Sequence, residues 1–268
     1  MRIARFAATG KDPAYGTIEL AVDGGEHPDT IAVLSNDPLA GGTAVNYTGE
    51  RHHLEDVRLL APLIPRSKII GAASNFWGHG VEKGGEVPAV PSLFLKPNTS
   101  IVGPNDPIII PEGHEHLNFE GEVAIVIGRI CKQVPRERVS EVIFGYTIAN
   151  DVSQRDWQKS DSQWIRAKGA DTFCPVGPWI NTHLSIEEAS NLSIQTRVSD
   201  EIRQDGNSSG MVHGIVDLVC FISSFTTLLP GDLILTGTPK GFGDMRDGDV
   251  VEVEIDGLGT LSNPVSAA

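Results

Sequence analysis

Residues 113–129, GHEHLNFEGEVAIVIGR, contain the strand that decides the fold class of this chain. Side chains of a β-strand alternate between its two faces, so Glu120 and Glu122 share one face of this stretch. Apolar residues follow on both faces within two positions, which predicts a strand buried on both sides. Two carboxylates about 4 Å apart repel by roughly 4 kcal/mol at an effective dielectric constant of about 20. We therefore expect a compensating group beside them; a solvated pair at an exposed strand start is the alternative.

The next strand-like stretch brings a third carboxylate into consideration. Residues 142–151, VIFGYTIAND, form an apolar run that ends in Asn150 and Asp151. The end of this run could deliver Asp151 to the same place as the two glutamates. Three convergent carboxylates without cysteine are typical of a hard cation, so we expect Mg²⁺ or Mn²⁺, with Ca²⁺ as a further alternative and Zn²⁺ disfavoured.

Short apolar stretches bounded by turn residues run through the rest of the chain and predict a mostly β fold with a few helices, in the α+β class. The stretches interpreted as strands are 67–74, 92–97, 107–112, 121–128, 142–151, 192–199, 231–237 and 249–265. Two intervals are predicted to be helical, 137–143 and 211–228. The second should end where Pro230 and Gly231 stop a helix.

The first 64 residues differ from the rest and are predicted to form a small N-terminal domain. Alternating stretches at 16–22 and 29–35 predict strands, and the charged stretch at 49–64 predicts a helix. A catalytic domain is then expected over residues 65–268.

The composition indicates a globular protein and limits its partners. The chain has 268 residues, 40% of them hydrophobic, and a formal net charge of -14 without a basic cluster, which argues against a nucleic-acid partner. No run of 18 apolar residues is present and the first residues do not form the apolar core of a signal peptide, so we expect no membrane span and a cytoplasmic location. An acidic protein that acts on small anions needs a local positive site, which directs attention to metal ions and lysines.

Six motifs in a fixed order, between Lys68 and Val265, resemble the fumarylacetoacetate hydrolase superfamily. They are NFWGHGVE, FLKPNTS, NFEGEVAIVIGR, GYTIANDVSQRDWQ, AKGADTFCPVGPW and LPGDLILTGTPKGFG. The resemblance is to the compact branch of the superfamily, which includes oxaloacetate decarboxylases and acylpyruvate hydrolases. It implies a β-roll catalytic domain, a homodimer and a small anionic 2-oxo acid as the substrate.

The resemblance also implies roles for individual residues. The metal ligands would be Glu120, Glu122 and Asp151, and the substrate-binding residues would be Lys168, Gln158, Arg155, Gly237 and Thr238, with Thr238 on the substrate carboxylate. Three positions depart from the usual family pattern: Phe76 stands where a tyrosine is common, and Asn118 and Gly121 replace more acidic or bulkier residues. These departures leave the substrate preference open.

The stretch NFWGHGVEKGG, residues 75–85, is predicted to belong to a lid that covers about residues 75–90. His79 and Glu82 are three residues apart, so a short helix would place them on one face, where the glutamate could orient the imidazole. The glycines disfavour a stable helix, so we expect the lid to become ordered over a bound substrate. A surface pair without a catalytic role is the alternative.

These residues predict a metal-dependent lyase or hydrolase that cleaves a carbon–carbon bond of a 2-oxo acid through a metal-bound pyruvate enolate. The favoured reaction is oxaloacetate decarboxylation, with Lys168 stabilising the developing negative charge and His79 and Glu82 assisting proton transfer. The alternatives are hydrolysis of an acylpyruvate or fumarylpyruvate and isomerisation or tautomerisation of a 2-hydroxymuconate-type diacid, which would place the enzyme in aromatic compound catabolism. A catalytically idle binding protein is the alternative from another class.

Overall fold

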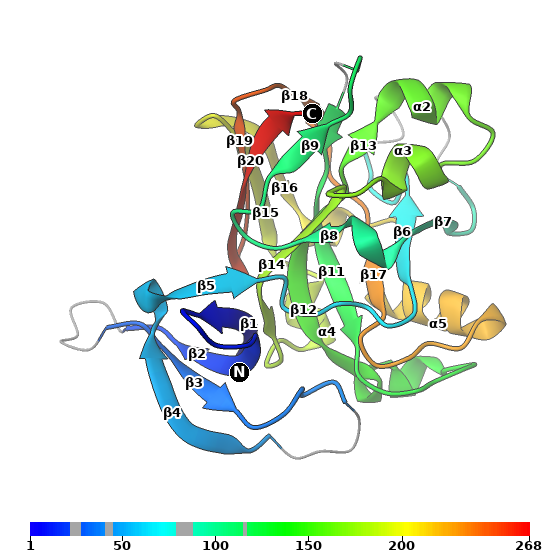
Figure 1. Cartoon of the computed structure of the whole chain (residues 1–268). Coiled ribbons are helices and arrows are strands. Elements are labelled where there is room, and N and C mark those ends of the chain that lie inside the picture. The colour runs from blue at the N-terminus through cyan, green and yellow to red at the C-terminus, as the bar shows by residue number, and fades with distance from the viewer. Residues whose placement is uncertain (22–27, 41–44, 79–87, 115–116) are drawn as a thin grey trace.

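The computed structural model of the chain describes residues 1–21, 28–40, 45–78, 88–114 and 117–268. His79 and Glu82, the predicted lid dyad, lie outside the described residues. Strands of three sheets dominate the described part of the chain, which confirms the mostly β fold (Figure 1). None of the helices in these residue ranges is long and apolar enough to cross a membrane.

The largest sheet contains both the N-terminal strands and the acidic strand. In spatial order its strands are β4 (Tyr47–His53), β3 (Thr30–Leu34), β2 (Ala14–Glu19), β1 (Arg2–Ala8), β14 (Cys174–Asn181), β12 (Ile143–Asn150), β11 (Gly121–Ile127), β17 (Leu233–Leu235), β6 (Ile69–Ala73) and β7 (Ser92–Lys96). Two further strands join it at the side, β5 (Val57–Leu60) on β1 and β8 (Ile101–Val102) on β14. The N-terminal strands, blue in Figure 1, thus extend the sheet of the larger part of the molecule.

This sheet curls until its far edge returns to its middle. The edge strand β7 is four places from β12 in the strand order, yet its last residue, Lys96, forms an ion pair with Asp151, directly after β12. The chain then continues into β8, which pairs in parallel with β14. The strands from β14 to β7 therefore close into a roll, as the family resemblance implies.

Two smaller sheets and short helices cover the roll. One sheet has the order β13 (Ser153–Gln154), β10 (Leu117–Phe119) and β18 (Gly243–Met245), and the other has β16 (Glu201–Asn207), β15 (Ser193–Val198), β19 (Val250–Ile255), β20 (Gly259–Ala267) and β9 (Ile108–Ile110). The helices are α2 (Arg155–Ser160), α3 (Ile165–Gly169), α4 (Ile186–Ala189) and α5 (Ile215–Phe225), and the 3₁₀ turns are η1 (Leu54–Asp56), η2 (Asn98–Ser100), η3 (Arg136–Glu141) and η4 (Ser208–Gly210).

The helix α5 confirms a helix within the predicted interval 211–228, but it begins at Ile215 and ends at Phe225. Its buried residues Ile215, Leu218, Val219 and Ile222 recur at helical spacing and pack into the main core. Asp217 accepts a hydrogen bond from the Gly214 amide at 3.3 Å, which completes the N-terminal turn. The helix ends at Phe225, before Pro230 and Gly231.

One helix prediction is wrong, and another, for residues 137–143, is confirmed in part as the 3₁₀ helix η3 (Arg136–Glu141). The charged stretch 49–64 is not a helix: it contains β4, η1 and β5, because β4 pairs with β3 at the edge of the sheet and exposes its charged side chains. The stretch 137–143 lies in the 3₁₀ turn η3 and the start of β12. Helices α2 and α3 and strand β14 were not predicted from the sequence.

Candidate metal centre and its pocket

The strand β11 is buried at every position and lies between β12 and β17, as the sequence predicted for a strand covered on both sides. Both neighbours run antiparallel to β11, so their C-terminal ends meet its N-terminal end. Gly121 pairs with Asn150, and the Asp151 amide donates to the Glu120 carbonyl at 2.8 Å. The sheet register therefore brings the end of β12 to the acidic start of β11.

Three carboxylates converge at this place. Glu120, Glu122 and Asp151 are all buried, and one oxygen atom from each lies within 4.8 Å of the others. Such a group could hold a metal ion, and a purely oxygen donor set suits Mg²⁺, Mn²⁺ or Ca²⁺ better than Zn²⁺. The donor set therefore fits the hard divalent cation that the sequence predicted.

Burial makes this arrangement costly for Glu122. Loss of hydration and then the charges of Asp151 and Glu120 raise the pKa of the Glu122 carboxyl well above its usual value. The Gly237 amide, just after β17, donates to a Glu122 oxygen at 2.6 Å and opposes this shift in part. Gly237 adopts a positive φ of 91°, and a Cβ there would lie 2.9 Å from the Asn75 Cβ, so glycine suits this turn.

Lys168, from α3, is the compensating group expected from the sequence. Its Nζ donates to Glu120 Oε2 at 2.7 Å and to Asp151 Oδ2 at 2.6 Å, and its side chain is only 3% exposed. Burial alone would lower the pKa of Lys168, but the charges of Asp151 and Glu120 outweigh this effect and raise it. Lys168 is therefore a protonated cation at neutral pH.

A second buried lysine was missed in the sequence. Lys96 at the end of β7 forms an ion pair with the other oxygen of Asp151, and its Nζ also lies 3.4 Å from the Val152 carbonyl. A lysine that ends an apolar strand just before Pro97 is unusual, and this was the available signal. Its proximity to Asp151 depends on the curl of the sheet.

Arg155 and Gln158, on α2, were predicted to bind substrate. The Arg155 guanidinium donates to Asn118 Oδ1 at 2.7 Å, to Gln158 Oε1 at 2.7 Å and to Glu120 Oε1 at 2.5 Å. Arginine has no acceptor, so the oxygen of the Gln158 amide must face it, and the amide nitrogen is left to face elsewhere. Arg155 thus fixes both Glu120 and Gln158, and Gln158 lines the pocket beside the carboxylates.

Thr238 also borders this pocket, and its hydroxyl is held by the protein. Thr238 Oγ1 donates to the Gly121 carbonyl at 2.8 Å and accepts from Gln204 Nε2 at 2.8 Å. The Gln204 side-chain oxygen accepts in turn from the Gly121 amide at 3.1 Å and from Thr196 Oγ1 at 2.8 Å. A side chain at Gly121 would lie 2.5 Å from Thr196 Oγ1, which explains glycine at this position.

The pocket beside the carboxylates, here called the inner pocket, has a volume of about 10 Å³. Besides the acidic residues and Lys168 it is lined by Ser74, Phe94 and Trp164. The first two residues of the predicted lid are well fixed: Asn75 donates to the His213 carbonyl at 2.9 Å and to the Thr236 carbonyl at 2.8 Å, while Phe76 packs in the core. Phe76 therefore serves packing where the family commonly has a tyrosine.

Comparison with models of protein families identifies the family of this chain. Residues 68–266 match the family described as fumarylacetoacetate (FAA) hydrolase C-terminal, and residues 1–62 match the Rv2993c-like N-terminal family. The chain belongs to the fumarylacetoacetate hydrolase family. Proteins of this family are enzymes that use divalent metal ions, and the carboxylate triad described above suits such an ion.

Two relatives illustrate the range of this fumarylacetoacetate hydrolase family. Protein Rv2993c of Mycobacterium tuberculosis is 48% identical over 268 residues, which cover 99% of this chain and 98% of that protein. The mitochondrial oxaloacetate tautomerase fahd2 of Xenopus laevis is 44% identical over 219 residues, which cover 78% of this chain and 69% of that protein.

Two solved structures agree with the fold over the whole of both chains. The structure of 5-carboxymethyl-2-hydroxymuconate delta-isomerase from Mycobacterium smegmatis has a TM-score of 0.89 and 45% identity. The structure of maleylpyruvate hydrolase from Sphingobium sp. SYK-6, in complex with manganese(II) and pyruvate, has a TM-score of 0.80 and 30% identity. The named activities of these relatives differ, so family membership leaves several reactions open.

Proposed function

We propose that this protein enolises a small 2-oxo acid with the help of a divalent metal ion held by Glu120, Glu122 and Asp151. The observation that carries the proposal is the buried carboxylate triad with the protonated Lys168 hydrogen-bonded between two of its members. When bound, a divalent cation would polarise the 2-oxo oxygen and disperse the negative charge that develops at that oxygen.

The charges of the surrounding side chains suit an anionic substrate. With all three carboxylates ionised, as metal binding requires, their charge of -3 is cancelled by the three cations that contact them: Lys96, Lys168 and Arg155. A divalent ion then leaves a net charge of about +2. For a 2-oxo acid with one carboxylate, that carboxylate and the developing enolate oxygen carry together about -2, which this charge neutralises. The second carboxylate of oxaloacetate adds a further charge of -1.

Individual residues take different parts in this proposal. Lys168 keeps its proton and would donate hydrogen bonds to the substrate, so it is a poor candidate for the base. The Gln158 amide nitrogen, turned away from Arg155, would donate to a substrate oxygen. His79 and Glu82 remain the proposed pair that takes and returns the proton at C3.

For the specific reaction, we propose keto-enol tautomerisation of oxaloacetate first. The 44% identity to an oxaloacetate tautomerase supports this choice over decarboxylation, which the sequence had favoured. The second candidate is carbon–carbon bond cleavage, by oxaloacetate decarboxylation or by acylpyruvate hydrolysis. The similarity to a maleylpyruvate hydrolase with bound manganese and pyruvate supports this second candidate.

Two substrates tested side by side would separate these reactions. The purified protein with Mn²⁺ or Mg²⁺ would be given enol-oxaloacetate and acetylpyruvate, with enol absorbance and pyruvate measured together. Enol loss without pyruvate indicates tautomerisation, pyruvate from oxaloacetate indicates decarboxylation, and pyruvate with acetate from acetylpyruvate indicates hydrolysis. His79→Ala should keep its metal and lose about 10² to 10⁴-fold in turnover. No turnover of either substrate by fully metal-loaded protein would refute the proposed function.

A further inference from the structure

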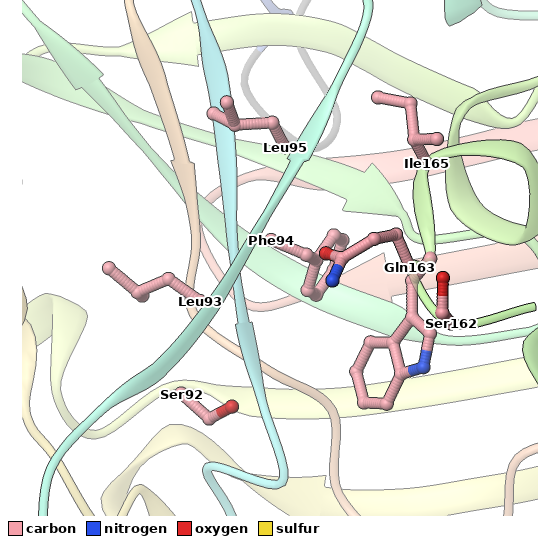
Figure 2. Close-up of a pocket in the computed structure, with 8 residues that line it drawn as sticks. Ser92, Leu93, Phe94, Leu95, Ser162, Gln163 and Ile165 are labelled. Carbon is pink, nitrogen blue, oxygen red and sulfur yellow. The ribbon is translucent and has the colours of Figure 1, made fainter.

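A second pocket opens beside the inner one, between the edge strand β7 and residues 162–165, which connect α2 to α3. This outer pocket has a volume of about 580 Å³, against about 10 Å³ for the inner pocket. In Figure 2, the Phe94 side chain points from β7 toward residues 162–165, and the Leu93 and Leu95 side chains point to the other side of β7. The inner pocket is about large enough for one water molecule, so most atoms of a larger ligand would need the outer pocket.

Two aromatic side chains join the pockets. Phe94 and Trp164 line both of them, with ring centroids 6.1 Å apart and ring planes inclined by 59°. The Lys168 Nζ lies 5.0 Å from the centroid of the Phe94 ring, so a single ring separates the charged centre from the outer pocket.

The position of Phe94 is itself fixed by the strand beneath it. Gly71 of β6 pairs with Phe94, and a Cβ built on Gly71 would clash with the Phe94 ring. The ring therefore lies directly over the backbone of β6. The ring held in this way forms a wall that the two pockets share.

The chemistry of the two pockets is opposite. Acidic and cationic side chains crowd the inner pocket, whereas the described residues around the outer pocket contribute apolar, aromatic, hydroxyl and amide groups and no charged side chain. A carboxylate placed in the outer pocket would lose hydration without gaining a counter-ion. Methylene groups and an aromatic or enol plane would instead gain contact with Trp164 and Phe94.

We infer that the outer pocket binds the uncharged distal arm of the substrate, while its carboxylate and 2-oxo group are held at the carboxylate triad. This inference rests on the proposed function for the position of the 2-oxo acid head. The preferred substrates are then 2-oxo acids with an uncharged arm. This arm is longer than the two carbons that follow the 2-oxo group in oxaloacetate.

Saturated 2-oxo acids, which have no activated carbon–carbon bond to cleave, allow a binding test without net product formation. Binding to the Mn²⁺-loaded protein would be measured by calorimetry for pyruvate, 2-oxohexanoate and 2-oxoadipate, where the last two share six carbons and differ in a terminal carboxylate. We expect 2-oxohexanoate to bind about tenfold or more tightly than pyruvate, because three added carbons are removed from water. We expect 2-oxoadipate to bind more weakly than 2-oxohexanoate.

Gln163 offers variants that change the outer pocket alone. Gln163→Trp fills it and should remove the advantage of 2-oxohexanoate over pyruvate, whereas Gln133→Trp adds the same bulk on an exposed turn and should keep that advantage. Gln163→Lys introduces a cation and should reverse the preference in favour of 2-oxoadipate. This reversal is a gain, so it cannot result from misfolding.

The outcomes separate this inference from the proposed function. Equal dissociation constants for pyruvate and 2-oxohexanoate, or a Gln163→Trp protein that still prefers 2-oxohexanoate, would overturn the inference while oxaloacetate turnover upheld the proposed function. Failure of the Mn²⁺-loaded protein to bind any of the three acids, together with absent turnover, would overturn both.

Discussion

Two regions of this molecule hold ion pairs of contrasting exposure, the exposed strand β4 and the buried end of β11. On β4, Arg51 pairs with Glu19 and Lys11 pairs with Glu50, and all four side chains are between 44% and 59% exposed. At β11, the side chains that pair Lys168 with Glu120 and Asp151 are at most 5% exposed. The same residue types therefore form ion pairs in a solvent-exposed region and in a buried region.

This difference shows how burial changes the energetics of an ion pair. On β4, water screens the charges and already solvates them in the unfolded chain, so each pair changes little when it forms. At β11, removal of water raises the cost of every unpaired charge and forces carboxylates and lysines to depend on each other. The buried carboxylates are therefore costly without a cationic partner, and their positions are already suited to bind a cation.

The largest effect is expected for Glu122→Gln, which removes one proposed metal ligand but keeps the shape of the side chain. Glutamine can still accept the hydrogen bond from the Gly237 amide, so the fold should persist. Metal affinity should fall by more than the roughly 10 to 100-fold typical for loss of an outer partner of a ligand, and turnover should disappear. Calorimetric titration with Mn²⁺ measures the first effect.

The Glu122→Gln variant should differ from an ordinary core mutation in its effect on the free energy of unfolding. Because burial raises the pKa of Glu122, its neutral replacement should leave the metal-free protein at least as stable as the parent at neutral pH. A Glu122→Gln protein that binds Mn²⁺ as the parent does would contradict the ligand assignment.

The next effect is expected for Lys96→Met, which leaves Asp151 with Lys168 as its remaining lysine partner. Breaking a buried ion pair from one side costs about 3 to 5 kcal/mol, so the free energy of unfolding of the metal-free protein should fall by about that amount. Denaturant unfolding measures it. The matched variant Lys11→Met removes a lysine from an exposed pair, and equal losses in the two variants would show that burial does not distinguish the regions.

A pH effect of intermediate size follows from Glu122. Its pKa in the folded, metal-free protein lies well above its value in the unfolded chain, so the folded state binds more protons and stability should fall as pH rises between these two values. Metal binding requires the ionised carboxyl, so metal affinity should increase with pH over the same interval and binding should release a proton. Titrations with Mn²⁺ in buffers of different ionisation enthalpy count this proton, and Glu122→Gln should abolish its release.

The smallest effect is expected for Arg51→Met on β4. Its partner Glu19 has a lowered pKa, mainly through the hydrogen bond from Arg51, but both groups are solvated. The melting temperature should not change measurably, and turnover should be that of the parent. A clear loss of thermal stability in Arg51→Met, comparable with that of Lys96→Met, would break the contrast between the regions.

Local pattern was enough to predict much of this protein. The alternation of residues 113–129 predicted a strand buried on both sides, and the apolar run ending at Asp151 placed the third carboxylate at its acidic start, as the register of β11 and β12 shows. Lys168 was implied by the family resemblance, and it lies against Glu120 and Asp151. The strand and the third carboxylate depend on side-chain period and on neighbouring strands, which the order of residues encodes directly.

Other features depended on pairing between distant segments. The charged stretch at 49–64 has a helix-like composition, but its pairing with β3 makes it a strand, because hydrogen bonds to an available sheet edge outweigh weak helical preference. Lys96 reaches Asp151, and Phe94 and Trp164 join two pockets, only because the sheet curls into a roll that returns β7 toward β12. That curl is the sum of many small strand twists and of packing across the core, so it exists in the tertiary structure and in no single stretch of sequence.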